Sequence, residues 1–491
     1  MAYQLADFPF LTTLLLCCIA GLLAILATPA KHTQAIKIVS AVFSGLTLVI
    51  SIYLFIAYDQ QAGGYQFVER VAWIPALGIA YFNGVDGFAL PMLLLTGIVF
   101  FTAVLTCWEM ELRVKEFFAL VFLLVTGVFG LFMSLDLFFI FVWFDVSLFP
   151  MYLLIAIWGS TRKEYGAMKL TLYLLAGSAL ILPAIVYLVV HSGAMTFDLL
   201  VLMEGDRFTP AQQRIAFFLL YIGFGILAGV FPFHTWSPVG HVAAPTAVSM
   251  IHAGVLMKIG AFGILRVGIF LCPEGWQYWA PLMAVLATCG IVYGTFVGLN
   301  QTDLKYVIGY SSVAHMGIVG LGLSTMTIDG LNGAVFQMFA HGIMTALFFS
   351  SVGYIYDRTH TKAIAELGGL SRIMPRATTF FILAALTGIG VPCLASFWGE
   401  LVVFMSCVRV YPVAGALAIG ALAVGALFML RVVQKTCYGP PLKKFAGLKD
   451  ITAALAVPRI ILASVIVLLG LFPGLLFDMI NTATMQLIGL R

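Results

Sequence analysis

Charged residues are scarce in this chain of 491 residues. Asp, Glu, Lys and Arg together make up 9% of it, whereas hydrophobic residues make up 62%. A soluble domain contains about 25% charged and about 45–50% apolar residues, so the composition excludes a soluble globular protein. Apolar segments close to the roughly 20 residues of a spanning helix recur along the whole length. The sequence therefore predicts an all-α, multi-pass membrane protein that forms a single membrane domain.

Several other signatures are missing. The eight cysteines form no CxxC pair, and most of them lie in apolar runs, which argues against a disulfide framework, a metal site or an iron–sulfur cluster. There is no basic arm, zinc spacing or basic patch with interleaved aromatics, so nucleic acid is not an expected partner. The first apolar run lacks a basic leader and a small-residue cleavage site, and we expect it to be a retained helix.

Apolar runs interrupted by turn residues predict about 14 spanning helices. Their expected centres are Leu16, Leu48, Leu95, Val125, Asp145, Leu180, Tyr221, Lys258, Leu286, Val313, His341, Leu386, Leu422 and Val467. Prolines interrupt two of these spans, the seventh within residues 231–246 and the twelfth within residues 388–396. In a membrane, such a break occurs only where protein or water satisfies the freed backbone groups.

The two discontinuous helices, 7 and 12, occupy corresponding positions in two halves of the chain. Paired interruptions of this kind indicate an inverted-repeat transporter that binds its ion at the breaks. The spacing predicts one five-helix repeat over residues 117–270 and a second over residues 281–433.

Lys and Arg are distributed unevenly between the loops. Most of the 25 basic residues fall in alternate loops, beginning with the loop between the first and second spans. The positive-inside rule assigns those loops to the cytoplasmic side. Both termini then face the positive, outer side of the membrane.

Four ionisable side chains lie near the middle of predicted spans: Asp145, Lys258, His341 and Glu400. A charge at the bilayer centre costs about 2.5–3.5 kcal/mol on insertion scales, and four unpaired charges would cost roughly 10 kcal/mol or more. The structural alternative for each residue is a hydrogen-bonded helix contact or, for the lysine, snorkelling to the interface. Snorkelling is disfavoured because Arg266, two turns later, already marks the interface. We interpret all four as sites of proton or ion movement.

Two further groups have two open interpretations each. His315 is either a proton relay or a hydrogen-bonding helix contact. Lys305 is predicted near the cytoplasmic end of its helix, where it is either an interface anchor or a site of proton uptake. We interpret His252 as a contact in the core.

The motifs around these residues resemble the antiporter-like subunits of respiratory complex I. The resemblance lies in residues 233–247, 253–260, 303–317 and 337–342. Residues 356–370 are most similar to the M-type subunit. The absence of a long C-terminal extension argues against the L-type subunit, and the resemblance covers essentially the whole chain.

The resemblance implies a fold of about 14 spanning helices with two inverted repeats, within a proton-pumping NADH:quinone oxidoreductase or a close relative. It implies a location in the bacterial inner (cytoplasmic) membrane, with L-type and N-type antiporter-like subunits as neighbours in the lipid bilayer. It also implies that NAD, FMN, iron–sulfur clusters and quinone are bound by other subunits, with no cofactor or redox site on this chain. Lys258, His341 and Glu400 match the family's line of proton-transferring groups.

Two positions depart from the family pattern. Asp145 lies where the family usually has glutamate, and Leu227 lies where it usually has the lysine that pairs with that acid. No Lys or Arg occurs within residues 215–240, and Pro238-Val239 replaces a proline-aspartate pair. We predict that Asp145 is neutral, or that it finds a cation on another residue or on a neighbouring subunit.

Three alternative functions stay open. The first is a subunit of a multi-subunit Na+/H+ antiporter, which shares the fold. The second is a hydrogenase-linked or ferredoxin-linked relative of complex I. The third is a diverged structural subunit that has lost pumping, an alternative that Leu227 motivates.

Overall fold

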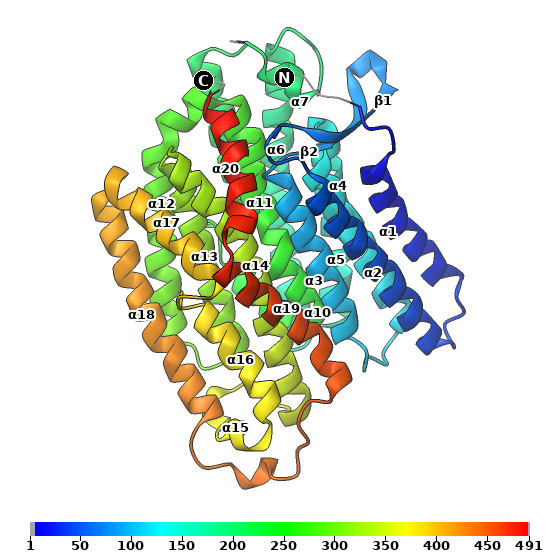
Figure 1. Ribbon diagram of the computed structural model, residues 1–491, viewed down its shortest axis with the longest axis vertical. Helices are drawn as coiled ribbons and strands as arrows, with labels where there is room; N and C mark the ends of the chain where they lie inside the picture. The colour runs from blue at the N-terminus through cyan, green and yellow to red at the C-terminus, as the bar shows by residue number, and fades with distance from the viewer. Residues whose placement is uncertain (1–4, 206, 490–491) are drawn as a thin grey trace.

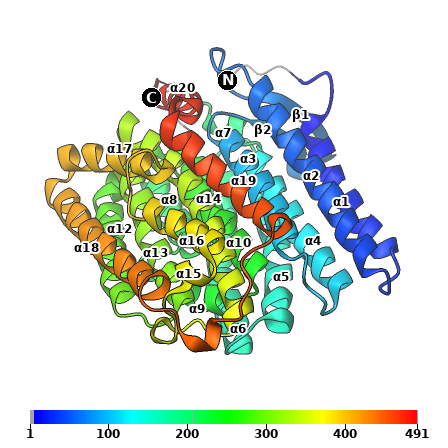
Figure 2. The same ribbon diagram turned by 60° about the horizontal axis from the view of Figure 1, so that its bottom comes forward.

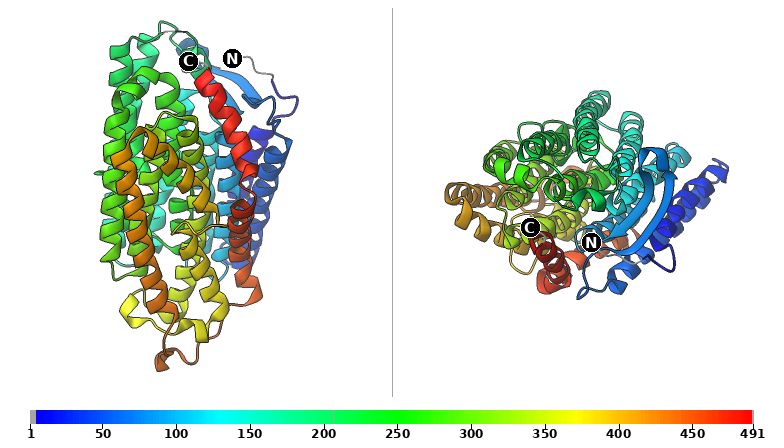
Figure 3. Two further views of the ribbon diagram at one scale, coloured as in Figure 1. Left: turned by 60° about the vertical axis from the view of Figure 1, so that its left-hand side comes forward. Right: turned by 90° about the horizontal axis from the view of Figure 1, so that it is seen from above.

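The computed structural model describes residues 5–205 and 207–489. Long helices lie side by side in an elongated bundle, seen from the front in Figure 1 and from the side and above in Figure 3. Thirteen of the described helices are long and apolar enough to cross a membrane. The prediction of an all-α membrane protein is confirmed, with the addition of one two-stranded antiparallel sheet.

The first part of the chain contains α1 (Phe10–Ala27), α2 (Thr33–Ala57), β1 (Gln66–Ile74), η1 (Pro75–Leu77), β2 (Ile79–Val85), α3 (Ala89–Thr106) and α4 (Val114–Met133). The second contains α5 (Leu137–Trp158), α6 (Lys163–His191), α7 (Leu199–Met203), α8 (Pro210–Ala228) and α9 (Trp236–Ala243). The eighth span contains α10 (Thr246–Ile251), the π-helical η2 (His252–Leu256), α11 (Met257–Gly263) and the π-helical η3 (Ile264–Ile269). The last part contains α12 (Pro273–Leu299), α13 (Leu304–Ser324), α14 (Ile328–Thr359), η4 (Ile364–Glu366), α15 (Leu370–Ile373), α16 (Pro375–Thr387), α17 (Ala395–Val410), α18 (Pro412–Cys437), η5 (Lys443–Phe445), α19 (Ala453–Leu471) and α20 (Gly474–Gly489).

Every predicted span centre lies inside a helix. The predicted twelfth span is divided into α16, of 13 residues, and α17, of 16 residues. The hairpin and α20 have no counterpart among the predicted spans, because β1 has 9 residues and α20 has 16, fewer than the roughly 20 that a spanning helix needs. The boundaries of the two inverted repeats stay a prediction.

The break in the seventh span is a turn whose freed backbone groups find partners. Helix α8 ends at Ala228, and Gly229 adopts a φ of 75°, a left-handed conformation that glycine tolerates. Pro232 has no amide hydrogen to continue a helix, and α9 begins at Trp236. The indole nitrogen of Trp236 donates to the carbonyl of Ile226 at 2.8 Å, which satisfies one of the carbonyls at the end of α8.

The break in the twelfth span is satisfied in a similar way. Helix α16 ends at Thr387, and the carbonyl of Gly388 in the break accepts a hydrogen bond from Nε2 of His315 at 3.1 Å. Gly390 in the same turn has a φ of 69°. A predicted site residue therefore supports the interrupted backbone.

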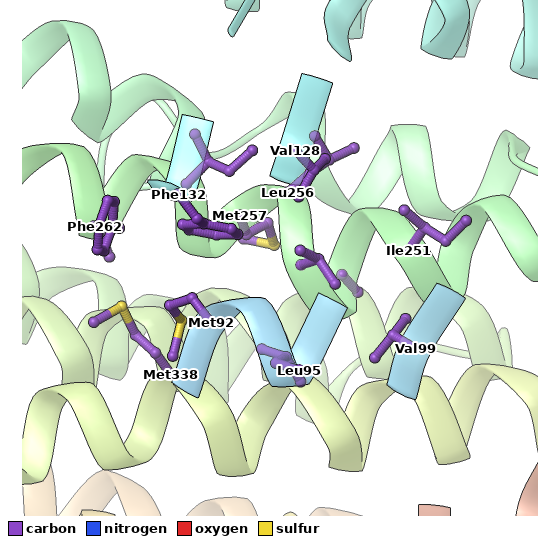
Figure 4. Packing of buried hydrophobic residues seen from close by; sticks show 14 of the residues in the cluster. Met92, Leu95, Val99, Val128, Phe132, Ile251, Leu256, Met257, Phe262 and Met338 are labelled. Atoms are coloured by element: carbon purple, nitrogen blue, oxygen red, sulfur yellow. The ribbon is translucent and has the colours of Figure 1, made fainter. Parts of the chain in front are cut away.

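The eighth span occupies the centre of the bundle. All residues of η2 and α11 are buried, and α3, α4 and α14 pack against this span. Figure 4 shows apolar side chains of this span packed among those of the neighbouring helices. The labelled side chains are Met92, Leu95, Val99, Val128, Phe132, Ile251, Leu256, Met257, Phe262 and Met338. Any ionisable group on this span is thus held away from lipid.

The hairpin and α20 lie together at one end of the bundle, and α15 lies at the opposite end (Figure 1). Glu69 of β1 binds the start of α1, because its carboxylate accepts hydrogen bonds from the backbone of Leu11 at 2.7 Å and of Thr12 at 3.0 Å. Helix α19 crosses between α3 and α14 (Figure 2), and α20 packs on α14. These elements tie the ends of the chain to the central helices.

Arg266, which the sequence analysis placed at the interface, is paired inside the protein. Its side chain is buried, and it donates to both carboxylate oxygens of Asp86, at 2.5 and 2.8 Å. The hydroxyl of Tyr65 accepts a third hydrogen bond at 2.7 Å. The arginine is needed inside because it joins η3 to the segment between β2 and α3.

We expect the Asp86–Arg266 pair to matter more for stability than the exposed Arg113–Glu116 pair. Asp86→Leu leaves a buried, unpaired guanidinium and should lower stability by about 3–5 kcal/mol. Asp86→Leu combined with Arg266→Met should recover most of that loss, whereas Glu116→Gln should change stability by about 0–1 kcal/mol. Thermal unfolding of the purified protein in detergent measures all three. Equal losses for Asp86→Leu and Glu116→Gln would contradict this account.

Candidate functional site

Four of the predicted site residues meet in one line of contacts through the core. Nζ of Lys258 lies 2.7 Å from Nδ1 of His341. The ring of His341 stacks on that of His315, with centroids 5.1 Å apart. Nε2 of His315 lies 3.4 Å from a carboxylate oxygen of Glu400. All four side chains are buried, so the line runs through protein and not along the lipid-facing surface.

Close helix packing brings Lys258 and His341 together. The π-helical turn η2 directly precedes α11, and Nζ of Lys258 also donates to the carbonyl of Ala253 in that turn. Gly254 of η2 and Gly342 of α14 lie at the crossing of the two helices. A Cβ at Gly342 would lie 2.5 Å from the carbonyl oxygen of Gly254, so glycine is required for this approach.

His315 and Glu400 form the second half of the line, next to the break in the twelfth span. Nδ1 of His315 lies 2.7 Å from the carbonyl of Ser311, and Nε2 faces both Gly388 and Glu400. Both ring nitrogens thus lie next to oxygen atoms that can accept a hydrogen bond. Gln337 donates to Glu400 at 3.3 Å. A simple helix contact does not explain why His315 lies next to Glu400, so the geometry favours the interpretation of His315 as a proton relay.

Two further buried histidines lie on the other side of Lys258. The rings of His241 and His252 have centroids 4.3 Å apart, and both are buried. None of their four ring nitrogens has a hydrogen-bond partner among the described residues. His252 also stacks on Trp236, which accounts for the predicted core contact but not for the unpartnered nitrogens.

The sequence interpretation assigned no role to His241. The available signal was its place in the motif of the seventh span, four residues before Pro245. His241 therefore lies in the last turn of α9, next to the break at Ala244.

Lys305 lies between this histidine pair and a polar cavity. It is buried, and its Nζ donates to the carbonyl of Ala244, the residue directly after α9, at 2.8 Å. A cavity of about 470 Å3 contains Lys305 in its wall, together with Glu109, Asp357 and Arg358. Lys305 thus joins an open, charged cavity to the buried histidines.

A second lysine lies close to this cavity, outside the spans. Lys362 donates to the hydroxyl of Ser160, which lines the cavity, at 3.3 Å. Its carbonyl accepts from the backbone of Leu304 at 3.0 Å, next to Lys305. Burial lowers the pKa of the Lys362 ammonium. Cationic side chains therefore gather where the cavity meets the start of α13.

The structure separates Asp145 from this line. Asp145 is half-buried on α5, and its carboxylate accepts a hydrogen bond from Ser178 of α6 at 2.9 Å. Leu227 is buried on α8. In the described part of the chain, none of the ion pairs includes Asp145. Within the same residues, no group of three or more His, Cys, Asp or Glu is placed to hold a metal ion.

Comparisons with known proteins identify relatives along the whole chain. The NADH:quinone oxidoreductase/Mrp antiporter transmembrane family matches residues 134–425. NADH-quinone oxidoreductase subunit M of Rickettsia prowazekii is 34% identical over 465 residues, which cover 93% of this chain and 94% of that protein. An NAD(P)H-quinone oxidoreductase chain 4 of Picosynechococcus sp. is 37% identical over 401 residues, covering 81% of this chain and 73% of the relative.

Solved structures share the fold over nearly the full length. A chain of respiratory complex I from Thermus thermophilus has a TM-score of 0.89 and 26% identity, and the match covers 98% of this chain and all of that one (100%). A chain of the Mrp complex from Dietzia sp. has a TM-score of 0.86 and 21% identity, covering 98% of both chains. The second likeness concerns the fold alone.

Proposed function

We propose, from the premise that this chain belongs to the NADH:quinone oxidoreductase/Mrp antiporter transmembrane family, that it is the M-type, proton-translocating membrane-arm subunit of a respiratory NADH:quinone oxidoreductase. The observation that carries the proposal is the buried line from Lys258 through His341 and His315 to Glu400. It connects the central span to the break in the twelfth span. The names of the relatives support the assignment of this chain to an NADH:quinone oxidoreductase.

Proton uptake is proposed to begin at the cavity that Lys305 lines. From Lys305, the proton passes by way of the backbone break at Ala244 to His241 and His252, and then to Lys258. Imidazole suits this step because each ring has one nitrogen that accepts a proton and one that releases it. The unpartnered ring nitrogens are consistent with transfer through ordered water, which is how buried polar groups without protein partners are commonly satisfied.

Transfer within the line follows from repulsion between neighbouring charges. Two unit charges 4 Å apart repel by about 4 kcal/mol at an effective dielectric constant of about 20. A proton arriving at Lys258 therefore destabilises a charge on His341 and His315, and Glu400 is the acceptor at the end of the line. The groups titrate as a coupled set, so no single step belongs to one residue.

The driving force comes from outside this chain. Redox reactions in other subunits, which would hold NAD, FMN, iron–sulfur clusters and quinone, change the charge or conformation at the subunit boundary. Neighbouring L-type and N-type antiporter-like subunits would pass that change on. In this proposal, the chain lies in a bacterial cytoplasmic membrane with both termini on the positive outer side, which places the Lys305 cavity on the basic, inner side.

Loss of the central amine should stop pumping. We expect Lys258→Met to slow proton transfer by roughly 10²-fold or more, the usual contribution of a positioned acid–base group. Lys31→Met removes the same group from an exposed loop and should have no effect. Proton uptake per electron, measured in membranes that contain the assembled complex, distinguishes the two variants. Undiminished pumping by Lys258→Met would refute the proposal and favour a structural subunit that no longer pumps.

The uptake branch makes a separate prediction. His241→Phe keeps the ring packing against Phe349 but removes both nitrogens, and it should slow pumping about as much as Lys305→Met. The double variant should be no slower than either single variant, because residues in one path are not additive. The exposed His191→Phe is the control. Additive defects in the double variant would show that His241 and Lys305 belong to different paths.

A further inference from the structure

We infer that Asp145 is one half of an ion pair between subunits. The geometry points to a transmembrane helix of a neighbouring subunit that docks on the α5–α6 face and places a Lys, Arg or His against this carboxylate. The inference rests on the proposed function only in taking the chain to work within a membrane complex of several subunits. It assigns to a different polypeptide the cation that position 227 lacks.

Asp145 is less buried than the ionisable side chains of the Lys258–Glu400 line. It lies on α5 (Leu137–Trp158), and it is half-buried, whereas Lys258, His341 and Glu400 are buried. Its one hydrogen bond within the described residues comes from the hydroxyl of Ser178 at 2.9 Å. A single neutral donor leaves most of the acceptor capacity of a carboxylate unused.

The chain cannot supply the missing cation from the usual position. Helix α6 packs against both α5 and α8 and separates Asp145 from Leu227. At the crossing of α6 and α8, a Cβ added to Gly177 would lie 2.8 Å from the carbonyl oxygen of Gly223. The two helices are therefore in close contact directly beside Ser178, and the partner must approach Asp145 from outside.

The surroundings of Asp145 are those of a helix-packing surface. Phe149, one turn further along α5, is 61% exposed, and Leu175 and Leu182 on α6 are 49% and 37% exposed. Ala176 and Ala179 of α6 are also exposed, and small residues allow a neighbouring helix to approach closely. The face is thus apolar and of low relief, with one acidic group at its centre.

Charge complementarity decides what covers this face. Lipid tails offer no hydrogen-bond donor, and ionisable groups in spanning segments almost always face protein or a water-filled cavity. A basic side chain satisfies the free oxygens of Asp145 with charge-assisted hydrogen bonds. A second copy of this chain would instead bring another acid to the face in a two-fold arrangement, which is unfavourable.

Photo-crosslinking in the assembled complex tests the contact directly. A photoreactive amino acid at Leu175 lies on the proposed face, and one at Leu417, which is 52% exposed on α18, lies on a different face. We expect the Leu175 crosslink to join a spanning helix of another subunit that has a Lys, Arg or His within its apolar stretch. A crosslink to lipid only, to a second copy of this chain, or to a helix without a basic residue would overturn the inference.

A charge exchange with that basic residue tests the ion pair. Asp145→Lys alone, and the basic residue replaced by Asp alone, should each reduce the yield of assembled complex or its proton uptake per electron. The two together should restore at least half of the lost quantity, and no recovery would contradict the pairing. Ser147→Ala, which removes a hydrogen bond within α5, is the control for packing. The crosslink does not depend on pumping, so its failure and that of the Lys258 experiment are distinguishable.

Discussion

The contact between Lys258 and His341 is the constraint on which the rest of this structure depends. An amine with no access to water needs a partner, and here an imidazole nitrogen lies 2.7 Å away. The approach requires Gly254 and Gly342 where the two helices cross, and a π-helical turn before the lysine. Both residues thus lie on spans that are fully buried in the bundle. A charge on Lys258 or His341 is therefore shielded from both lipid and solvent.

The two helix breaks place polar groups at either end of the contact between Lys258 and His341. The break at the seventh span sets His241 and the carbonyl of Ala244 between the cavity and Lys258. The break at the twelfth span brings the carbonyl of Gly388 and the carboxylate of Glu400 to His315. Interrupted helices thus provide polar backbone at membrane depth, where it is surrounded by protein. Both breaks contact the same helix, α13, through Lys305 at Ala244 and through His315 at Gly388.

Local sequence predicted much of the site and all of the span centres. Lys258, His341 and Glu400 are conspicuous because an ionisable residue in an apolar run is costly wherever it points. The partners were less predictable. Both interpretations of His315 fitted the sequence, and only the fold brings its ring to Glu400. The partner of Arg266 was not predicted because Asp86 lies 180 residues away in the chain, and no local pattern connects them.

The β-hairpin, α20 and the surroundings of Asp145 were also not predicted from the sequence. The β-hairpin and α20 are too short for the apolar-run criterion, and their position depends on contacts with α1 and α14. Asp145 was expected in the polar line, because its depth in the span equals that of the other groups. Depth does not determine direction, however, and the half-buried carboxylate contacts Ser178 of α6 instead of the buried line.

The most direct test of the central claim is the infrared signal of the Glu400 carboxyl group in the assembled complex during turnover. The signal is assigned by its loss in Glu400→Gln and then compared between the unmodified chain and Lys258→Met. If protons pass along one coupled line, the Glu400 band changes during turnover in the unmodified chain, and the change disappears in Lys258→Met. An identical change in both proteins would contradict the account.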